Sequence, residues 1–160
     1  VVGNAAEKNP ELIKRIYEEG HAIGNHSYSH KYNYIYRRVS NFISELERTE
    51  KVLKNILGKN YETKIIRFPG GSFGDKKAPF RKAVIDKGYS YYDWNSLNGD
   101  AEGHNLSKNK LVQRFKETYK GQNKLTILMH DMDAKKTTPE SLPDIIKFLQ
   151  EKGYEFDTFK

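Results

Sequence analysis

Helical and strand-like segments alternate along the whole chain, and this alternation restricts its fold more than any other feature. Apolar residues on one face, bounded by proline or glycine, predict helices, whereas short apolar or aromatic runs predict strands. The predicted helices are Pro10–Glu19, about Ser40–Leu57, about Ala78–Lys87, about Lys108–Tyr119, and a last one from near Thr138 to Gly153. The predicted strands are His21–Gly24, Lys64–Phe68, Tyr89–Tyr92, Leu125–Met129 and Tyr154–Phe159. The order predicts an α/β architecture with a largely parallel sheet.

Length and composition limit the classes of protein that fit. The 160 residues suit a single domain. The lack of cysteine excludes disulfides, thiolate metal ligands and a cysteine nucleophile. The charge of +7, from 28 basic and 21 acidic residues, suits an anionic partner, but the lysines are dispersed, so a solvated basic surface is the simpler interpretation and nucleic acid is not expected. No apolar run approaches the ~20 residues of a membrane span.

Two histidines four residues apart, His26 and His30 in the sequence His-Ser-Tyr-Ser-His, are candidate metal ligands. On a helical turn, imidazoles at this spacing point the same way and can bind one metal ion. Catalytic zinc usually takes three protein ligands, often including a carboxylate, and keeps one position for water. The spacing also arises by chance on surfaces, so the pair needs other residues beside it to indicate a metal site.

Further polar residues follow predicted strands. They are Arg67 at the carboxyl end of the second strand, Asp93 and Trp94 after the third, and His130 with Asp131 after the fourth. The carboxyl ends of parallel strands meet at one edge of the fold, where α/β proteins bind ligands and carry out catalysis. The sequence therefore predicts that these residues and the histidine pair belong to one functional site.

With these motifs in this order, the chain resembles the polysaccharide deacetylases of the family-four carbohydrate esterases. The family's second motif matches residues 26–30, its third Arg67-Phe68-Pro69-Gly70-Gly71, its fourth Asp93-Trp94-Asn95 and its fifth Leu128-Met129-His130. The resemblance covers nearly the whole chain. It implies an irregular (β/α) barrel, with residues 1–160 forming a single catalytic domain.

The resemblance also implies roles for the polar residues. His26 and His30 would bind one divalent metal ion, zinc, with cobalt and nickel as alternatives. Arg67 would orient a catalytic carboxylate, and His130 would be the general acid. Asp93 would pair with His130 and favour the charged imidazole.

Other residues of the matched motifs are implied to contact the substrate. Trp94 and Leu128 would form the walls of a pocket for the acetyl methyl group, and Gly70 would offer its backbone N–H to the oxyanion. Tyrosines near the histidine pair are candidates for stacking on sugar rings, namely Tyr28, Tyr32, Tyr34 and Tyr36.

Two departures from the family pattern stand out. The first motif, a strand ending in paired aspartates that supply the base and the third metal ligand, is absent, because Val1-Val2-Gly3 resembles the segment just after it. The chain is therefore expected to be an N-terminally truncated fragment, and it is open whether it is inactive, poor in metal, or lacking one strand of the barrel. The second departure is Gly70, which stands where many members carry an aromatic residue.

The function that the resemblance implies is hydrolysis of N-acetyl groups on N-acetylglucosamine units of a polysaccharide. Peptidoglycan is the leading substrate, with chitin oligomers and acetylated xylan left open. A monomer acting outside the membrane of a bacterium, extracellular or at the cell surface, is expected, with any signal or anchor lying upstream.

Two other functions compete with this interpretation. Gly70-Gly71-Ser72-Phe73-Gly74 matches the G-x-S-x-G nucleophile elbow, so Ser72 is a candidate nucleophile of a serine esterase, although residues 75–79 separate it from the next helix. The other alternative is a non-catalytic module that binds glycan or cell wall.

Overall fold

The computed structural model describes residues 1–159 and divides the chain into two compact units. The first unit comprises residues 1–93 with 158 and 159, and the second comprises Trp94–Asp157. The elements of the first unit are α1 (Gly3–Lys8), α2 (Pro10–Glu18), α3 (Tyr32–Ile35), α4 (Val39–Leu57), β1 (Ile65–Ile66), the 3-10 turn η1 (Asp75–Lys77), α5 (Ala78–Asp86) and β2 (Ser90–Tyr91). Those of the second unit are β3 (Ser96–Leu97), α6 (Lys108–Thr118), β4 (Ile127–Leu128) and α7 (Thr137–Glu151).

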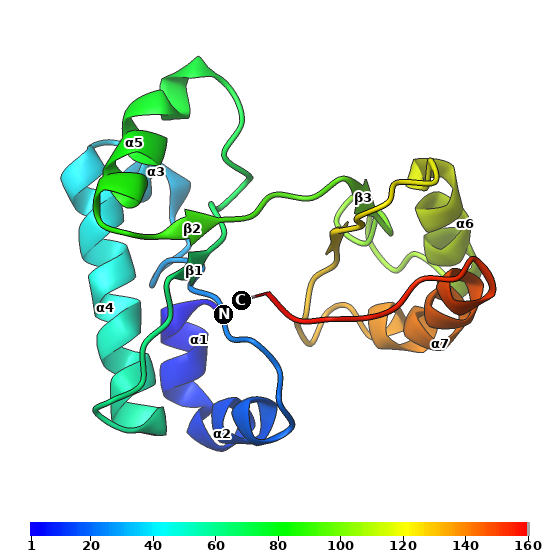
Figure 1. Cartoon of the computed structure of the whole chain (residues 1–160), viewed down its shortest axis with the longest axis horizontal. Coiled ribbons are helices and arrows are strands. Elements are labelled where there is room, and N and C mark those ends of the chain that lie inside the picture. The colour runs from blue at the N-terminus through cyan, green and yellow to red at the C-terminus, as the bar shows by residue number, and fades with distance from the viewer. Residues whose placement is uncertain (160) are drawn as a thin grey trace. The chain divides into compact units, whose positions relative to one another are not determined.

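Helix α4 is the central element of the first unit. In Figure 1, α1 lies along its C-terminal half and α5 along its N-terminal half. The helix ends at Gly58, whose φ of +109° favours glycine. This stop matches the predicted end of the helix, as the proline start of α2 at Pro10 matches its predicted start.

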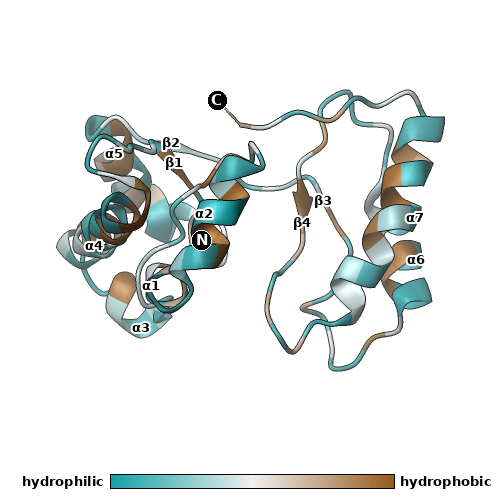
Figure 2. Cartoon of the chain, turned by 90° about the horizontal axis from the view of Figure 1, so that it is seen from below, coloured by the Kyte–Doolittle hydropathy of each residue, from teal (hydrophilic) through white to brown (hydrophobic). Residues whose placement is uncertain are grey.

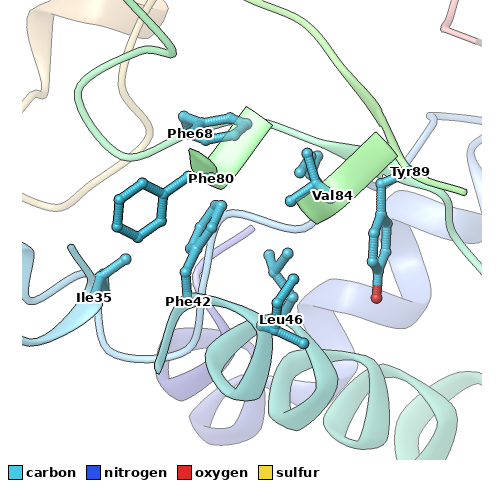
Figure 3. Packing of buried hydrophobic residues seen from close by; sticks show 9 residues of the cluster. Ile35, Phe42, Leu46, Phe68, Phe80, Val84 and Tyr89 are labelled. Atoms are coloured by element: carbon cyan, nitrogen blue, oxygen red, sulfur yellow. The ribbon is translucent and has the colours of Figure 1, made fainter. Parts of the chain in front are cut away.

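Aromatic side chains fill the core between α4 and the strands. Phe42 of α4 packs against Phe68, which follows β1, with ring centroids 4.8 Å apart. Both rings are almost fully buried. Figure 3 shows them among the residues of this cluster, which also includes Ile35, Leu46, Phe80, Val84 and Tyr89. The apolar face predicted for this helix is confirmed, because Phe42 and Leu46 are buried in this cluster and Leu53 is buried in a second one.

The strands of the first unit are short and parallel. Ile66 of β1 pairs with Tyr91 of β2 on one side and forms a parallel bridge with Asn25 on the other. The residues that follow these three positions are His26, Arg67 and Tyr92. The predicted convergence of strand ends is thus confirmed for this unit, although its strands extend over only two residues each.

The second unit is built from one parallel strand pair and two helices. Leu97 of β3 pairs with Leu128 of β4. Helices α6 and α7 pack together through Phe115, Ile145 and Leu149, all buried. Figure 2 shows each helix with apolar and polar residues on different sides. Ser107 caps α6, because its hydroxyl accepts a hydrogen bond from the N–H of Lys110.

Some expectations from the sequence are wrong in detail. The predicted strand Tyr154–Phe159 does not form, and Tyr154 instead donates its hydroxyl hydrogen to the carbonyl of Gln122. The predicted strand His21–Gly24 does not form either, and the pairing nearby is the single bridge of the next residue, Asn25. Helices α1 and α3 were not predicted, since both are shorter than the window of about 11 residues over which helical periodicity can be recognised. No helix within residues 1–159 has the length and apolar character needed to cross a membrane.

Candidate metal-binding and catalytic site

The histidine pair lies on a loop that starts at the buried residue Asn25. The N–H of Asn25 donates to the carbonyl of Ile65 at 2.8 Å, which holds the loop to β1. Its side chain donates to the carbonyl of Leu46 at 2.9 Å and accepts from the N–H of Ser27 at 3.1 Å. Asn25 therefore fixes the loop both to the strand and to α4.

The loop is not a helical turn, and in this respect the sequence expectation is wrong. Ser27 has a φ of +64° and His30 a φ of +55°, both in the left-handed region. The hydroxyl of Ser27 accepts the N–H of His30 at 3.1 Å. The two imidazoles thus approach each other because side chains within the loop bind its backbone, and not because residues i and i+4 share a helix face.

Glu45 of α4 holds the middle of this loop, a role that the sequence analysis missed. One carboxylate oxygen, Oε2, accepts the N–H of Tyr28 at 3.0 Å, the N–H of Ser29 at 2.6 Å and the hydroxyl of Ser29 at 2.9 Å. Glu45 is 7% exposed. The available signal was an acidic residue inside the apolar stripe of a helix, next to Leu46.

The two rings are oriented as a pair of metal ligands requires. The Nε2 atoms of His26 and His30 are 3.2 Å apart. Two nitrogens at the ~2.0–2.1 Å of a tetrahedral zinc site lie about 3.3–3.4 Å apart, so the separation fits a shared metal ion. The Nδ1 of His26 is 2.8 Å from the carbonyl of Arg67 and must donate to it, which leaves Nε2 with its lone pair. Without metal, the same separation allows an N–H···N hydrogen bond.

Burial lowers the pKa of His26 to about 4, although the hydrogen bond to Arg67 O acts in the opposite direction. Positive charge nearby, including the Arg67 guanidinium, adds to the lowering. His26 is therefore neutral at pH 7, which is the form that binds a metal ion. Within residues 1–159 no group of three or more His, Cys, Asp or Glu side chains is arranged to hold a metal, so the described chain offers the histidine pair alone.

Arg67 and Asp93 follow the two paired strands of the first unit. The Nε of Arg67 donates to the carbonyl of Tyr92 at 3.1 Å. Burial lowers the pKa of Arg67, and the negative charge of Asp93 partly opposes this. Asp93 accepts the N–H of Ser72 at 2.9 Å and the hydroxyl of Ser72 at 2.5 Å. Asp93 thus fixes the loop that follows the third motif.

Ser72 does not have the environment of a nucleophile elbow. It is 4% exposed, and its hydroxyl donates to Asp93 and not to an imidazole. The next helix, α5, starts only at Ala78, after the turn η1. An elbow requires an exposed hydroxyl at a direct strand-to-helix turn, so this geometry disfavours the serine esterase.

The loop around Gly70 presents a backbone donor. The N–H of Gly71 donates to the carbonyl of Phe68 at 2.8 Å, whereas among the described residues the N–H of Gly70 has no acceptor. The carbonyl of Pro69 accepts the hydroxyl of Tyr36 at 2.7 Å and the ammonium of Lys77 at 3.1 Å. These bonds hold the loop, and the Gly70 N–H remains available to an oxyanion, as the resemblance implies.

In the second unit, the carboxylate bonded to His130 is Asp100 and not the predicted Asp93. Asp100 Oδ1 is 2.7 Å from the Nδ1 of His130, and Oδ2 accepts the N–H of His130 at 2.7 Å. Thr138 also donates to Oδ2, at 3.0 Å. Burial acts to raise the pKa of Asp100, but the hydrogen bonds from His130 and Thr138 hold that pKa below its usual value. The His130 side chain is 39% exposed.

Asp100 was missed because the sequence analysis assigned no strand to residues 96 and 97. Asp100 follows β3, and β3 pairs with β4, which leads to His130. A strand signal at β3 would have placed both residues after adjacent parallel strands. Trp94 and Leu128 belong to this same unit and are half-buried, with Leu128 on β4. Their role as walls of an acetyl pocket stays a prediction.

Comparison with known proteins identifies the family. The sequence profile of the polysaccharide deacetylase family matches residues 1–92. A peptidoglycan-N-acetylglucosamine deacetylase from Bacillus cereus is 29% identical over 168 residues, which cover 99% of this chain and 58% of the relative. The chain spans about half the length of the curated relatives it matches.

Solved structures agree with the sequence comparison. A CE4 esterase from Streptococcus mutans matches with a TM-score of 0.89 and 32% identity, covering 99% of this chain and 72% of that one. A polysaccharide deacetylase from Bacillus cereus matches with a TM-score of 0.87 and 26% identity, covering 99% and 76%. The fold class predicted from the sequence is thereby confirmed. The chain belongs to the polysaccharide deacetylase family.

Proposed function

We propose that this protein is a metal-dependent deacetylase that hydrolyses N-acetyl groups on the N-acetylglucosamine units of peptidoglycan. The observation that carries the proposal is the pair of Nε2 atoms of His26 and His30, 3.2 Å apart, with the His26 ring oriented by the carbonyl of Arg67. The proposed metal is zinc, with cobalt and nickel as alternatives. Peptidoglycan is favoured because the similar Bacillus cereus protein bears the name of a peptidoglycan-N-acetylglucosamine deacetylase. Such a substrate implies action at the cell surface.

Amide hydrolysis breaks the bond between the acetyl carbon and the sugar nitrogen. Water adds its oxygen to the acetyl carbon, and the nitrogen leaves as an amine after taking up a proton. A bound zinc ion would polarise the acetamide carbonyl and lower the pKa of water. His26 and His30 would hold that ion, and the N–H of Gly70 would donate to the oxyanion.

His130 is the proposed donor of the proton that the amine takes up. Asp100 holds its Nδ1 at 2.7 Å, so Nε2 is the atom left to transfer a proton to the substrate. Because Asp100 also accepts the His130 backbone N–H and the Thr138 hydroxyl, the carboxylate and the ring are both fixed. Asp100 acts through His130 and is therefore a positioning residue. Arg67 is proposed, as the family resemblance implies, to orient a catalytic carboxylate that would take the proton given up by water. In the family the first motif supplies that carboxylate, and residues 1–160 do not contain this motif.

The test measures acetate released from N-acetylated peptidoglycan together with zinc bound per chain. Release that needs one equivalent of zinc, stops with a chelator and is absent in His26→Gln supports the proposal. His130→Gln should keep its zinc and lose most of its acetate release. Binding of glycan and zinc without acetate release would instead support the non-catalytic module. Release that persists with chelator and stops in Ser72→Ala would support the serine esterase.

A further inference from the structure

Tyr32 lies immediately beside the histidine pair. It is the first residue of α3, and its ring meets the ring of His30 edge to face, with centroids 5.2 Å apart and an interplanar angle of 75°. His30 in turn lies 4.9 Å from the ring of His26. The Tyr32 residue is 47% exposed, so much of the ring remains open to solvent.

The ring of Tyr32 also occupies the space beside Gly70. A Cβ atom on Gly70 would lie 2.9 Å from Cε1 of Tyr32 and 3.2 Å from its hydroxyl oxygen. The φ of +72° at Gly70 adds a second reason for glycine there. The absence of a side chain at position 70 therefore lets the tyrosine ring stand between His30 and the loop that carries the candidate oxyanion donor.

The other three tyrosines near the pair are differently placed. The ring of Tyr28 is covered by the guanidinium of Arg48, 3.5 Å from its centroid, and its hydroxyl donates to Glu7. Tyr36 packs in the core with Phe42 and Phe80 and bonds Pro69 O. Tyr34 is 49% exposed, on the same short helix as Tyr32, but it has no ring contact with another described residue.

We propose that Tyr32 is an aromatic platform on which a sugar ring of the glycan substrate stacks next to the acetamide held at the histidine pair. The inference rests on the proposed function. A pyranose presents apolar C–H groups on its face, and an exposed aromatic ring at a polar site is the surface that binds such a face. Tyr36 packs its ring against Phe42 and Phe80 at the edge of the core, whereas Tyr32 leaves about half its surface exposed beside the histidine pair.

The experiment measures the affinity of the zinc-loaded chain for an N-acetylglucosamine tetramer by calorimetry. Tyr32→Ala should weaken binding about tenfold, which is the size of effect that loss of one aromatic contact produces. Tyr32→Phe should bind like the parent, because the ring and not the hydroxyl makes the contact. Tyr34→Ala is the matched control, with equal exposure on the same helix, and should also bind like the parent.

Zinc titration of each variant separates this role from an effect on the metal site. Tyr32→Ala should bind zinc as the parent does. Loss of zinc binding in that variant would contradict the proposal that Tyr32 stacks on the sugar, because its effect on tetramer binding would then arise from a disturbed His30. Unchanged tetramer affinity in Tyr32→Ala, with the parent binding well, would overturn the inference while leaving the proposed function standing. Failure of the parent itself to bind the tetramer would overturn both.

A double-mutant cycle with Gly70→Ala tests the contact between ring and loop. Gly70→Ala should displace the ring and weaken tetramer binding about threefold in the parent. The same substitution should have almost no effect in Tyr32→Ala, since there is then no ring to displace. The backbone strain at position 70 is common to both backgrounds and cancels in the cycle. Equal effects of Gly70→Ala in both backgrounds would contradict the proposed arrangement.

Discussion

The carboxylate of Asp100 forms two hydrogen bonds with His130. Its Oδ1 is 2.7 Å from the ring Nδ1, and its Oδ2 accepts the backbone N–H at 2.7 Å. The carboxylate is 3% exposed, while the imidazole is 39% exposed. The buried partner is thus fixed inside the second unit and the titratable ring faces outward. His130 is therefore paired with Asp100 and not with Asp93, the partner that the family resemblance implied.

Asp100→Asn should lower kcat for acetate release by about 100-fold, within the range for loss of a positioned acid. The amide can turn either its oxygen or its NH2 group to His130 Nδ1 and no longer fixes the proton on that atom. Zinc affinity should not change, because the Asp100 carboxylate bonds His130 and Thr138 and is not a proposed metal ligand. Asp133→Asn, at an exposed position three residues after His130, is the control and should keep full activity. An Asp100→Asn variant as active as the parent would contradict the role.

Glu45→Ala should both destabilise the protein and weaken zinc binding. The substitution leaves the N–H groups of Tyr28 and Ser29 without their acceptor, at a cost of about 2–4 kcal/mol in the free energy of unfolding. Zinc affinity should fall about 10- to 100-fold, since the loop that orients His30 loosens. Denaturant unfolding and zinc calorimetry measure the two effects. Glu45→Gln keeps one acceptor oxygen and should be milder in both, and equal losses in the two variants would count against the hydrogen-bond explanation.

The stability of the metal-free chain should fall as the pH drops from about 6.5 to about 4. Above pH 6.5 the His26 imidazole is neutral in both the folded and the unfolded chain and contributes no pH dependence. Below it the unfolded chain takes up a proton that the folded chain, with its pKa of about 4, does not, so unfolding is favoured. The full loss is about 3 kcal/mol, complete below pH 4.

Urea unfolding across this pH range, with His26→Gln as the reference, isolates the contribution of His26. The free energy of unfolding of the parent should exceed that of the variant by a smaller amount at pH 4 than at pH 7. Only the parent carries the imidazole whose protonation favours the unfolded chain. A constant difference from pH 7 to pH 4 would show that burial of His26 does not perturb its titration.

Phe42→Ala should lower the free energy of unfolding by about 3–5 kcal/mol, the range for removing a buried aromatic ring. Phe42 is fully buried and contacts the rings of Tyr36, Phe68 and Phe80. Leu12→Ala, at a residue 49% exposed on α2, should cost much less than Phe42→Ala. Thermal or denaturant unfolding compares the two, and similar losses would mean that the cluster around Phe42 is not the main core of this unit.

The helices were largely predictable because their signals are local. Each signal lies within the helix that it predicts or directly beside it. For α2 it is Pro10, and for α4 it is Gly58 together with the apolar spacing of Phe42 and Leu46. The order of strands and the positions of His26 and Arg67 at strand ends were predictable for the same reason. The prediction of a helical turn at His26 was wrong. The segment is a loop instead, because the side chains of Asn25, Ser27 and Glu45 form hydrogen bonds with its backbone. Such bonds join residues up to 21 positions apart and leave no periodic signal.

The partner of His130 shows a second limit of sequence reasoning. Asp93 follows the predicted strand Tyr89–Tyr92 and matches the fourth motif, whereas Asp100 follows a segment in which no strand was predicted. Only the pairing of β3 with β4 brings Asp100 beside His130, and these strands extend over two residues each. A strand this short carries too little alternation to be recognised from sequence alone. Contacts that depend on such pairing therefore require the structure.

Zinc titration of the chain by calorimetry shows directly whether His26 and His30 form a metal site. The parent should bind one equivalent, and His26→Gln should bind none, because the Nε2 lone pair oriented by Arg67 O is lost. His21→Gln removes a histidine whose side chain is 63% exposed and should bind as the parent does. A folded parent that binds no zinc, or a His26→Gln variant that binds as tightly as the parent, would contradict the assignment of this pair as the metal site.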